Sequence, residues 1–216
     1  MRFKLIFLFT AFILSCSETV PFSSKNELNF GIVIHGGAGT MNRKDMTPEK
    51  ENEYRQALEE SITLGYKILN EGGTSQDAVE ISIRMMENSP LFNAGKGAVL
   101  TAEKTIELDA AFMNGKDLNA GAIASVKTIK NPITAAIKVM EQSPHVLLSG
   151  RGAEKFAEEK GLEIVDPSYF FTQRRINDLD KMKSIESSAN VSIKESEKEF
   201  LSTQRYGTVG AVALDK

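Results

Sequence analysis

The chain has 216 residues, a net charge of −3, a hydrophobic fraction of 41%, one cysteine and two histidines. That length and apolar content are typical of one globular domain with a sizeable core. The lone cysteine excludes an internal disulfide, two histidines leave little for a histidine-rich metal site, and the lack of a basic stripe argues against nucleic acid as a partner.

The N-terminus has the pattern of an export signal. Arg2 and Lys4 precede an apolar run over 5–14, which is too short to span a bilayer on its own. We therefore expect residues 1–15 to be a signal peptide, and the protein to leave the cytoplasm for the cell envelope or periplasm.

The end of this run suggests how the protein is anchored. The sequence Ile-Leu-Ser-Cys at 13–16 resembles a bacterial lipobox, in which the signal is removed before the cysteine and the thiol is lipidated. This predicts lipidation of Cys16 and a polar tether over 16–28. A plain secretory signal with an incidental cysteine is the alternative.

A short apolar run over 30–35 predicts a buried strand that leads into the glycine turn at 36–40. A dinucleotide-binding loop is excluded because Asn42 stands where the third glycine should be. An esterase oxyanion loop would need a G-x-S-x-G nucleophile motif, which the chain lacks. We expect His35 to pack in the turn and not to catalyse.

Two helices are predicted next, one starting at Thr47 and Pro48 and ending at the glycine pair 72–73, the other lying between 74 and Pro90. Further along the chain, two strands are joined by the hairpin signal Asn-Gly-Lys-Asp, and two more helices follow. The ranges expected are 106–113 and 120–126 for the strands, 114–117 for the hairpin turn, and 132–140 and 152–160 for the helices.

Residues 172–207 are rich in Lys, Glu, Ser and Asp and predict a mobile or partly helical linker. Arg174 and Arg175 would then be the solvated start of this linker, and His145 a loop residue. The order of elements is typical of an α+β sandwich with helices outside two sheets, and not of strict βαβ alternation.

The segment 206–215 has the pattern of a self-processing nucleophile. Its alternation of small and β-branched residues predicts a strand starting at Thr208, behind Gly207. If the chain breaks between these two residues, the new α-amino group has a pKa of roughly 7.7–8.0 and can act as the base for the hydroxyl of the same residue. An ordinary strand after Gly-Thr is the alternative.

Three segments, 34–39, 90–110 and 206–215, together resemble the plant-type L-asparaginases, also called isoaspartyl aminopeptidases, of the N-terminal-nucleophile hydrolases. The resemblance implies a four-layer αββα sandwich, incomplete in this chain. It also implies an α-subunit part over 29–171 and the start of a β subunit over 208–216, joined by the linker.

The function implied is an amidohydrolase that releases ammonia from L-asparagine and cleaves β-aspartyl dipeptides. Thr208 would be the nucleophile, freed by autoproteolysis after Gly207. Asn93 would orient the Thr208 amine or hydroxyl, and its alternative role is a loop cap. The chemistry would need no cofactor, and the assembly would be a dimer of αβ heterodimers.

The resemblance also implies a structural sodium ion, held mostly by backbone carbonyls of the loop after the second helix. A P-loop is excluded there because Gly97, not Ser or Thr, follows Gly95 and Lys96. The implied carbonyl donors are Met86, Glu87, Ser89, Phe92, Ala94 and Lys96.

In the family, a second threonine, an Arg-Asp clamp for the substrate and an oxyanion hole come from the second half, so we expect this chain by itself to be an inactive fragment. We likewise expect the strand after Thr208 to lack its pairing partners. Glycosylasparaginase, and a non-catalytic envelope lipoprotein that keeps the scaffold, are the alternative functions.

Overall fold

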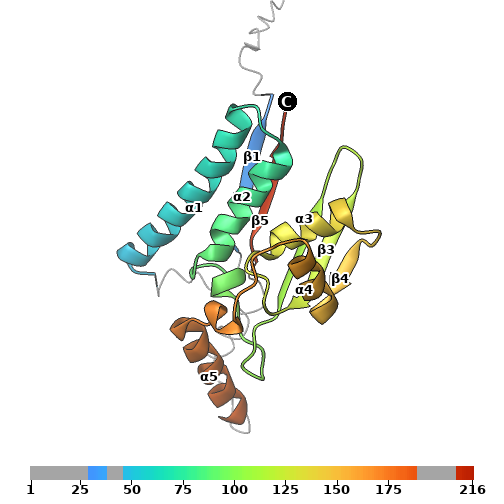
Figure 1. Ribbon diagram of the computed structural model, residues 1–216. Coiled ribbons are helices and arrows are strands. Elements are labelled where there is room, and N and C mark those ends of the chain that lie inside the picture. The colour runs from blue at the N-terminus through green and yellow to red at the C-terminus, as the bar shows by residue number, and fades with distance from the viewer. Residues whose placement is uncertain (1–28, 38–45, 189–207) are drawn as a thin grey trace, which may run out of the picture.

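The structure of the chain is a computed structural model with an α+β architecture, in which helices pack against two separate sheets (Figure 1). It describes residues 29–37, 46–188 and 208–216; the expected signal peptide, Cys16 and Gly207 lie outside this part. No helix in the described part is long and apolar enough to cross a membrane. In chain order the elements are β1 (Gly31–His35), α1 (Pro48–Asn70), α2 (Ser75–Asn88), η2 (Gly95–Gly97), β2 (Leu108–Met113), β3 (Ala120–Val126), α3 (Pro132–Gln142), β4 (Leu147–Ser149), α4 (Gly150–Glu159), η3 (Pro167–Phe170), α5 (Gln173–Ser188) and β5 (Gly210–Leu214).

The first two helices have the boundaries that their capping residues predict. The Thr47 hydroxyl accepts a hydrogen bond from the Lys50 N–H at 3.3 Å, and the Thr74 hydroxyl accepts one from the Asp77 N–H at 3.1 Å. Gly72, with a φ of 84°, ends α1 in a conformation that glycine adopts without steric cost. These caps fix where α2 starts, and α2 carries part of the site described below.

The first sheet pairs the two ends of the described chain. β1 and β5 are antiparallel, with Val33 opposite Val212. Ala211 and Ala213 face the helical layer, where they pack against a buried cluster from α1 and α2. On the other face, Val33, Val212 and Leu214 are 70%, 74% and 66% exposed. Only one face of this sheet is therefore covered within the described residues.

Three predictions about this sheet are wrong. The last strand begins at Gly210, not at Thr208, because β1 ends at His35, which is opposite Gly210. The strand is also paired, with β1 as its partner. His35 does not pack in the turn: its side chain is exposed, because strand alternation turns it to the same open face as Val33.

The second sheet contains the predicted hairpin. β2 and β3 are antiparallel, and the turn is closed by the Lys116 N–H, which donates to Asn114 Oδ1 at 2.9 Å. β4 pairs parallel with β3 and was not predicted. Side chains from α3 and α4 form a second buried core with this sheet and with Phe170. His145 is a loop residue, as expected.

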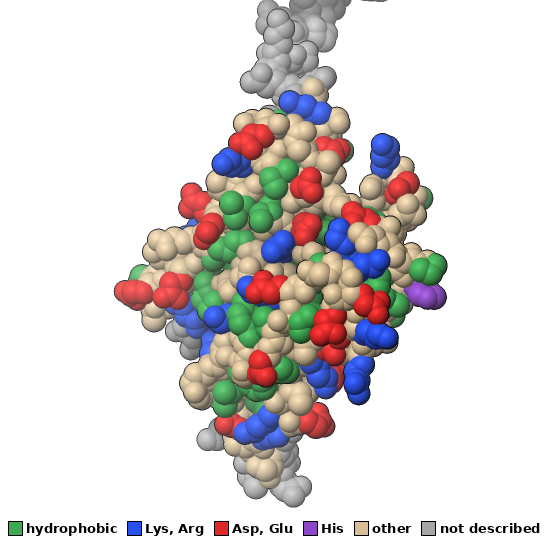
Figure 2. All heavy atoms as spheres, in the orientation of Figure 1, with side chains coloured by type: hydrophobic (Ala, Val, Ile, Leu, Met, Phe, Trp, Pro, Cys, Tyr) green, Lys and Arg blue, Asp and Glu red, His purple; other side chains and the backbone are tan. Residues whose placement is uncertain are grey.

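Residues 173–188 form α5, which Figure 1 shows at the far end of the molecule from the chain's C-terminus. The prediction that the arginines start a solvated linker is wrong, because Arg175 is 4% exposed. Leu179 and Ile185 are buried on the same helix. On the face drawn in Figure 2, acidic and basic side chains are interspersed, so that face has no single-sign patch that would suit nucleic acid.

Candidate active site

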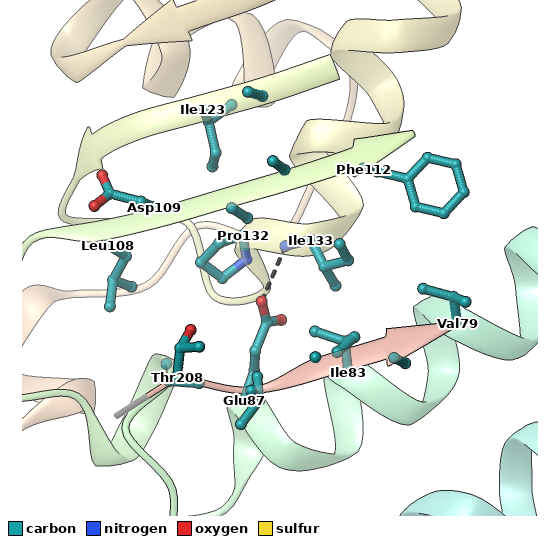
Figure 3. Close-up of a pocket in the computed structure, with 18 of the residues that line it drawn as sticks. Val79, Ile83, Glu87, Leu108, Asp109, Phe112, Ile123, Pro132, Ile133 and Thr208 are labelled. Carbon is teal, nitrogen blue, oxygen red and sulfur yellow. Dashed lines mark hydrogen bonds between the residues drawn. The ribbon is translucent and has the colours of Figure 1, made fainter. Parts of the chain in front are cut away.

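A cavity of about 1010 Å³ lies between β5 and the β2–β3 hairpin. Figure 3 shows this cavity in close-up. The end of α2 and the start of α3 form what we call its floor, and the side chains of Thr208 and Glu87 point into the space. Its lining comes from both sheets, two helices and the loop around η2. A small polar molecule entering it would therefore meet groups from segments that are far apart in the sequence.

Thr208 and Asn93 line this same cavity. Thr208 lies two residues before β5 and is exposed, and it lines the cavity. Asn93 comes from the loop between α2 and η2, far from Thr208 in the sequence. The structure thus brings the expected nucleophile and the expected orienting amide to one place.

Asn93 also closes its own loop. Its Oδ1 accepts a hydrogen bond from the Val99 N–H at 2.9 Å. The loop-capping role is therefore confirmed, and it fixes the direction of the amide plane. A role toward Thr208 is compatible with it, because the amide also carries two N–H donors.

Glu87 is a buried acid at the floor of the cavity. Its carboxyl accepts hydrogen bonds from the Ile133 N–H at 3.0 Å and from Asn131 Nδ2 at 3.1 Å, and it is 3% exposed. Burial raises the pKa of Glu87 to about 8, against the opposing effect of these two donors. The group is therefore largely protonated at neutral pH, and it joins the end of α2 to the first turn of α3.

Glu87 was expected to contribute only its backbone carbonyl, and the role of its side chain was not predicted. Val79, Ile83 and Glu87 follow one another at a spacing of four, so they share one face of α2, and all three line the cavity. That spacing was a readable signal that the glutamate would be buried.

The loop between α2 and η2 is shaped by two glycines. Gly95 has a φ of 47°, and a Cβ at this position would overlap the carbonyl oxygen of Glu87. A Cβ on Gly97 would overlap the carbonyl oxygen of Phe92. Carbonyl oxygens of two expected cation donors thus occupy space that only glycine leaves open.

This arrangement fits a hard cation held by backbone oxygens. All six expected donors lie between the last turn of α2 and η2. The Met86 carbonyl accepts one hydrogen bond, from the Ser89 N–H, and the Ala94 carbonyl accepts one from the Gly97 N–H. Each oxygen has a second lone pair. Side chains offer no alternative in the described residues, where no group of three or more His, Cys, Asp or Glu could hold a metal ion.

Two acidic residues of the second sheet also line the cavity, and neither was predicted. They are Glu107 and Asp109, and Asp109 Oδ1 accepts a hydrogen bond from the Ser125 N–H at 2.8 Å. The positive charge of Lys96 makes a cation–π contact with Tyr169, because its Nζ lies 5.3 Å from the centre of that ring.

Comparison with known proteins connects this site to an enzyme family. A family model described as asparaginase matches residues 28–216. The chain is 45% identical over 184 residues to an isoaspartyl peptidase of Escherichia coli, covering 85% of this chain and 56% of that protein. It is 40% identical over 198 residues to an isoaspartyl peptidase/L-asparaginase of Mus musculus (90% and 56% covered), and 40% identical over 188 residues to a plant-type L-asparaginase of Pyrococcus horikoshii (85% and 59%). The chain therefore spans little more than half the length of these relatives.

Proposed function

The chain belongs to the asparaginase family, and on that premise we propose that the protein is an amidohydrolase that releases ammonia from L-asparagine and cleaves β-aspartyl dipeptides. The names of its relatives carry the substrate classes. The structural observation that carries the proposal is that Thr208 and Asn93, far apart in sequence, line one cavity.

The proposed reaction begins with maturation. The Thr208 hydroxyl attacks the Gly207 carbonyl, the peptide nitrogen leaves as the new α-amine of Thr208, and water hydrolyses the resulting ester. The free α-amine then serves as general base for the neighbouring hydroxyl. Asn93 holds the amine or hydroxyl in the attacking direction.

In turnover, the Thr208 hydroxyl adds to the side-chain carbonyl of asparagine, or to the β-aspartyl carbonyl of a dipeptide. Ammonia or the peptide amine leaves with a proton, and an acyl-enzyme ester remains. Water then attacks the ester and releases aspartate. The hydrogen bonds of Glu87 keep the floor of the cavity fixed during these steps.

The finer architecture is part of the same proposal. The two sheets, each packed against helices, are the inner layers of a four-layer αββα sandwich whose remaining strands come from the other half of the family's sequence. The six carbonyls from Met86 to Lys96 would hold a structural sodium ion that stiffens the loop carrying Asn93. Cys16 would anchor the protein to a membrane outside the cytoplasm, and two αβ units would form a dimer.

Two measurements, of chain cleavage and of activity, test the proposed function. Intact-mass analysis of the full-length gene product should show two fragments that meet between Gly207 and Thr208, and Thr208→Ala should remain a single chain. Ammonia release from L-asparagine, cleavage of β-Asp-Leu and cleavage of a glycosylated asparagine then separate this activity from that of a glycosylasparaginase. An intact wild type without any of the three activities would favour the non-catalytic lipoprotein.

A further inference from the structure

Two adjacent arginines at the start of α5 bind the loop that carries Asn93. Arg175 Nε donates to the Gly97 carbonyl at 2.7 Å, and Arg174 Nη2 donates to the Leu91 carbonyl at 3.2 Å. Arg174 Nη1 also donates to the Tyr54 hydroxyl at 2.9 Å, and that hydroxyl donates to the same Leu91 carbonyl at 3.1 Å. The loop is therefore gripped near both of its ends.

Arg175 is buried and Arg174 is half-buried, and removing these charges from water is unfavourable unless hydrogen bonds compensate. Arg175 is 4% exposed, and the one acidic group paired with it in the described residues is Asp178, 3.6 Å away. Burial and the neighbouring Arg174 charge lower the pKa of Arg175, against the effect of Asp178. Guanidinium groups in such a place need hydrogen-bond acceptors. The loop carbonyls provide one to each arginine, while Arg174 Nε is buried without a partner in the described part of the chain.

Asn93 lies between the two gripped carbonyls. Its Oδ1 accepts a hydrogen bond from the N–H of Val99, which follows Gly97 in the chain. Asn93 lines the cavity together with Thr208. Since Leu91 and Gly97 are held by α5, the segment between them has little freedom to move the amide. Errors of about 1 Å in the placement of such a group cost on the order of 10²-fold in rate.

We propose that Arg174 and Arg175 are positioning residues, which hold the Asn93 loop from outside and so fix the amide relative to Thr208. The proposal rests on the proposed function for its catalytic consequence, but its structural part stands on the hydrogen bonds alone. Neither arginine lines the cavity, so both would act through the loop backbone.

The simpler explanation is that the arginines only attach α5 to the rest of the fold. That attachment has other components. Lys183 Nζ donates to the Ala102 carbonyl at 2.6 Å, Lys104 pairs with Asp180 at 3.0 Å, and Leu179 is buried. Neither Ala102 nor Lys104 lines the cavity. Lys183 therefore offers a matched control that loosens α5 without touching the loop.

The test uses the full-length gene product with Arg175→Lys, which keeps the charge but loses the planar donor that reaches Gly97. We expect kcat and the rate of self-cleavage to fall by about tenfold or more, with KM unchanged within about twofold. Hydrogen exchange at the Val99 amide, which reports the Asn93 bond, should become faster. Lys183→Met should change none of these three quantities.

Each outcome decides the question. Wild-type kcat and wild-type Val99 exchange in Arg175→Lys would overturn the proposal, as would equal losses of kcat in Arg175→Lys and Lys183→Met. If Arg175→Lys shows no cooperative unfolding transition, Arg174→Lys is measured in its place, with the same expectations through Leu91. An inactive wild type would contradict the proposed function. The loop-holding role would still be tested by hydrogen exchange at the Val99 amide, because that measurement needs no activity.

Discussion

The loop between Leu91 and Gly97 and the sheet of β1 and β5 are held in opposite ways. The loop is fixed by hydrogen bonds from three sides: the α5 arginines, Tyr54, and its own Asn93. The sheet packs one face against α1 and α2, and it leaves large apolar side chains open on the other. β5 and the loop both line the cavity, so the proposed nucleophile Thr208 leads into the loosely covered sheet, and the proposed orienting residue Asn93 lies on the tightly held loop.

The largest effect should come from breaking the held loop. Gly97→Ala places a Cβ against the backbone oxygen of Phe92, which cannot move aside as a flexible side chain would. We expect the free energy of unfolding in urea to fall by about 3 kcal/mol. Gly152→Ala is the control, because a Cβ there meets nothing within 4 Å and a helical alanine stabilises by about 0.5–1 kcal/mol. Similar losses in both variants would show that the crowding at Gly97 is relieved at little cost.

The next effect depends on pH. The folded-state pKa of Glu87 is about 8, above its ordinary value of 4.5, so between these values the folded protein keeps a proton that the unfolded chain releases. The group therefore makes the free energy of unfolding fall as pH rises through this window, by up to about 1.4 kcal/mol per pH unit. Glu87→Gln, which is neutral at every pH, should lose that slope. Urea titrations at a series of pH values measure it, and parallel curves for both proteins would contradict the burial argument.

A smaller effect is expected from removing the hydroxyl of Tyr54, which hydrogen-bonds the loop. Tyr54→Phe removes the donor to the Leu91 carbonyl and the acceptor for Arg174 Nη1. The packing of the ring is kept, so the free energy of unfolding should fall by about 1 kcal/mol. Chemical denaturation gives the value, and no change would mean that solvent replaces both bonds without loss.

The smallest effect belongs to the open face of the sheet. Val212→Thr should change the free energy of unfolding by less than about 0.5 kcal/mol, because the side chain is 74% exposed. The same substitution at Val79, which is 8% exposed, should cost more than about 1 kcal/mol because it buries a hydroxyl. If the free energy of unfolding falls equally in both variants, the face of the sheet that carries Val212 is covered in the protein that was measured.

Local patterns in the sequence predicted the capped helices and the hairpin, and the resemblance to the family placed Thr208 and Asn93 in one site. These depend on neighbours in the chain or on a motif order. The burial of Arg175 could not be predicted in this way, since its acceptor at Gly97 is distant in sequence and its own segment is polar. The short β4 was missed for a similar reason: its partner strand β3, not its composition, makes it a strand.

The pairing of β1 with β5 joins nearly the first and the last described residues, Gly31 and Leu214. During synthesis β1 emerges long before its partner β5, because most of the described chain lies between them. Contacts between such distant residues form slowly, because the intervening chain must lose conformational entropy before these contacts stabilise the fold. Thr208, next to β5, can reach its cavity only after this closure. If Thr208 is the nucleophile that we propose, self-cleavage would follow folding, and an incompletely folded chain would stay uncut.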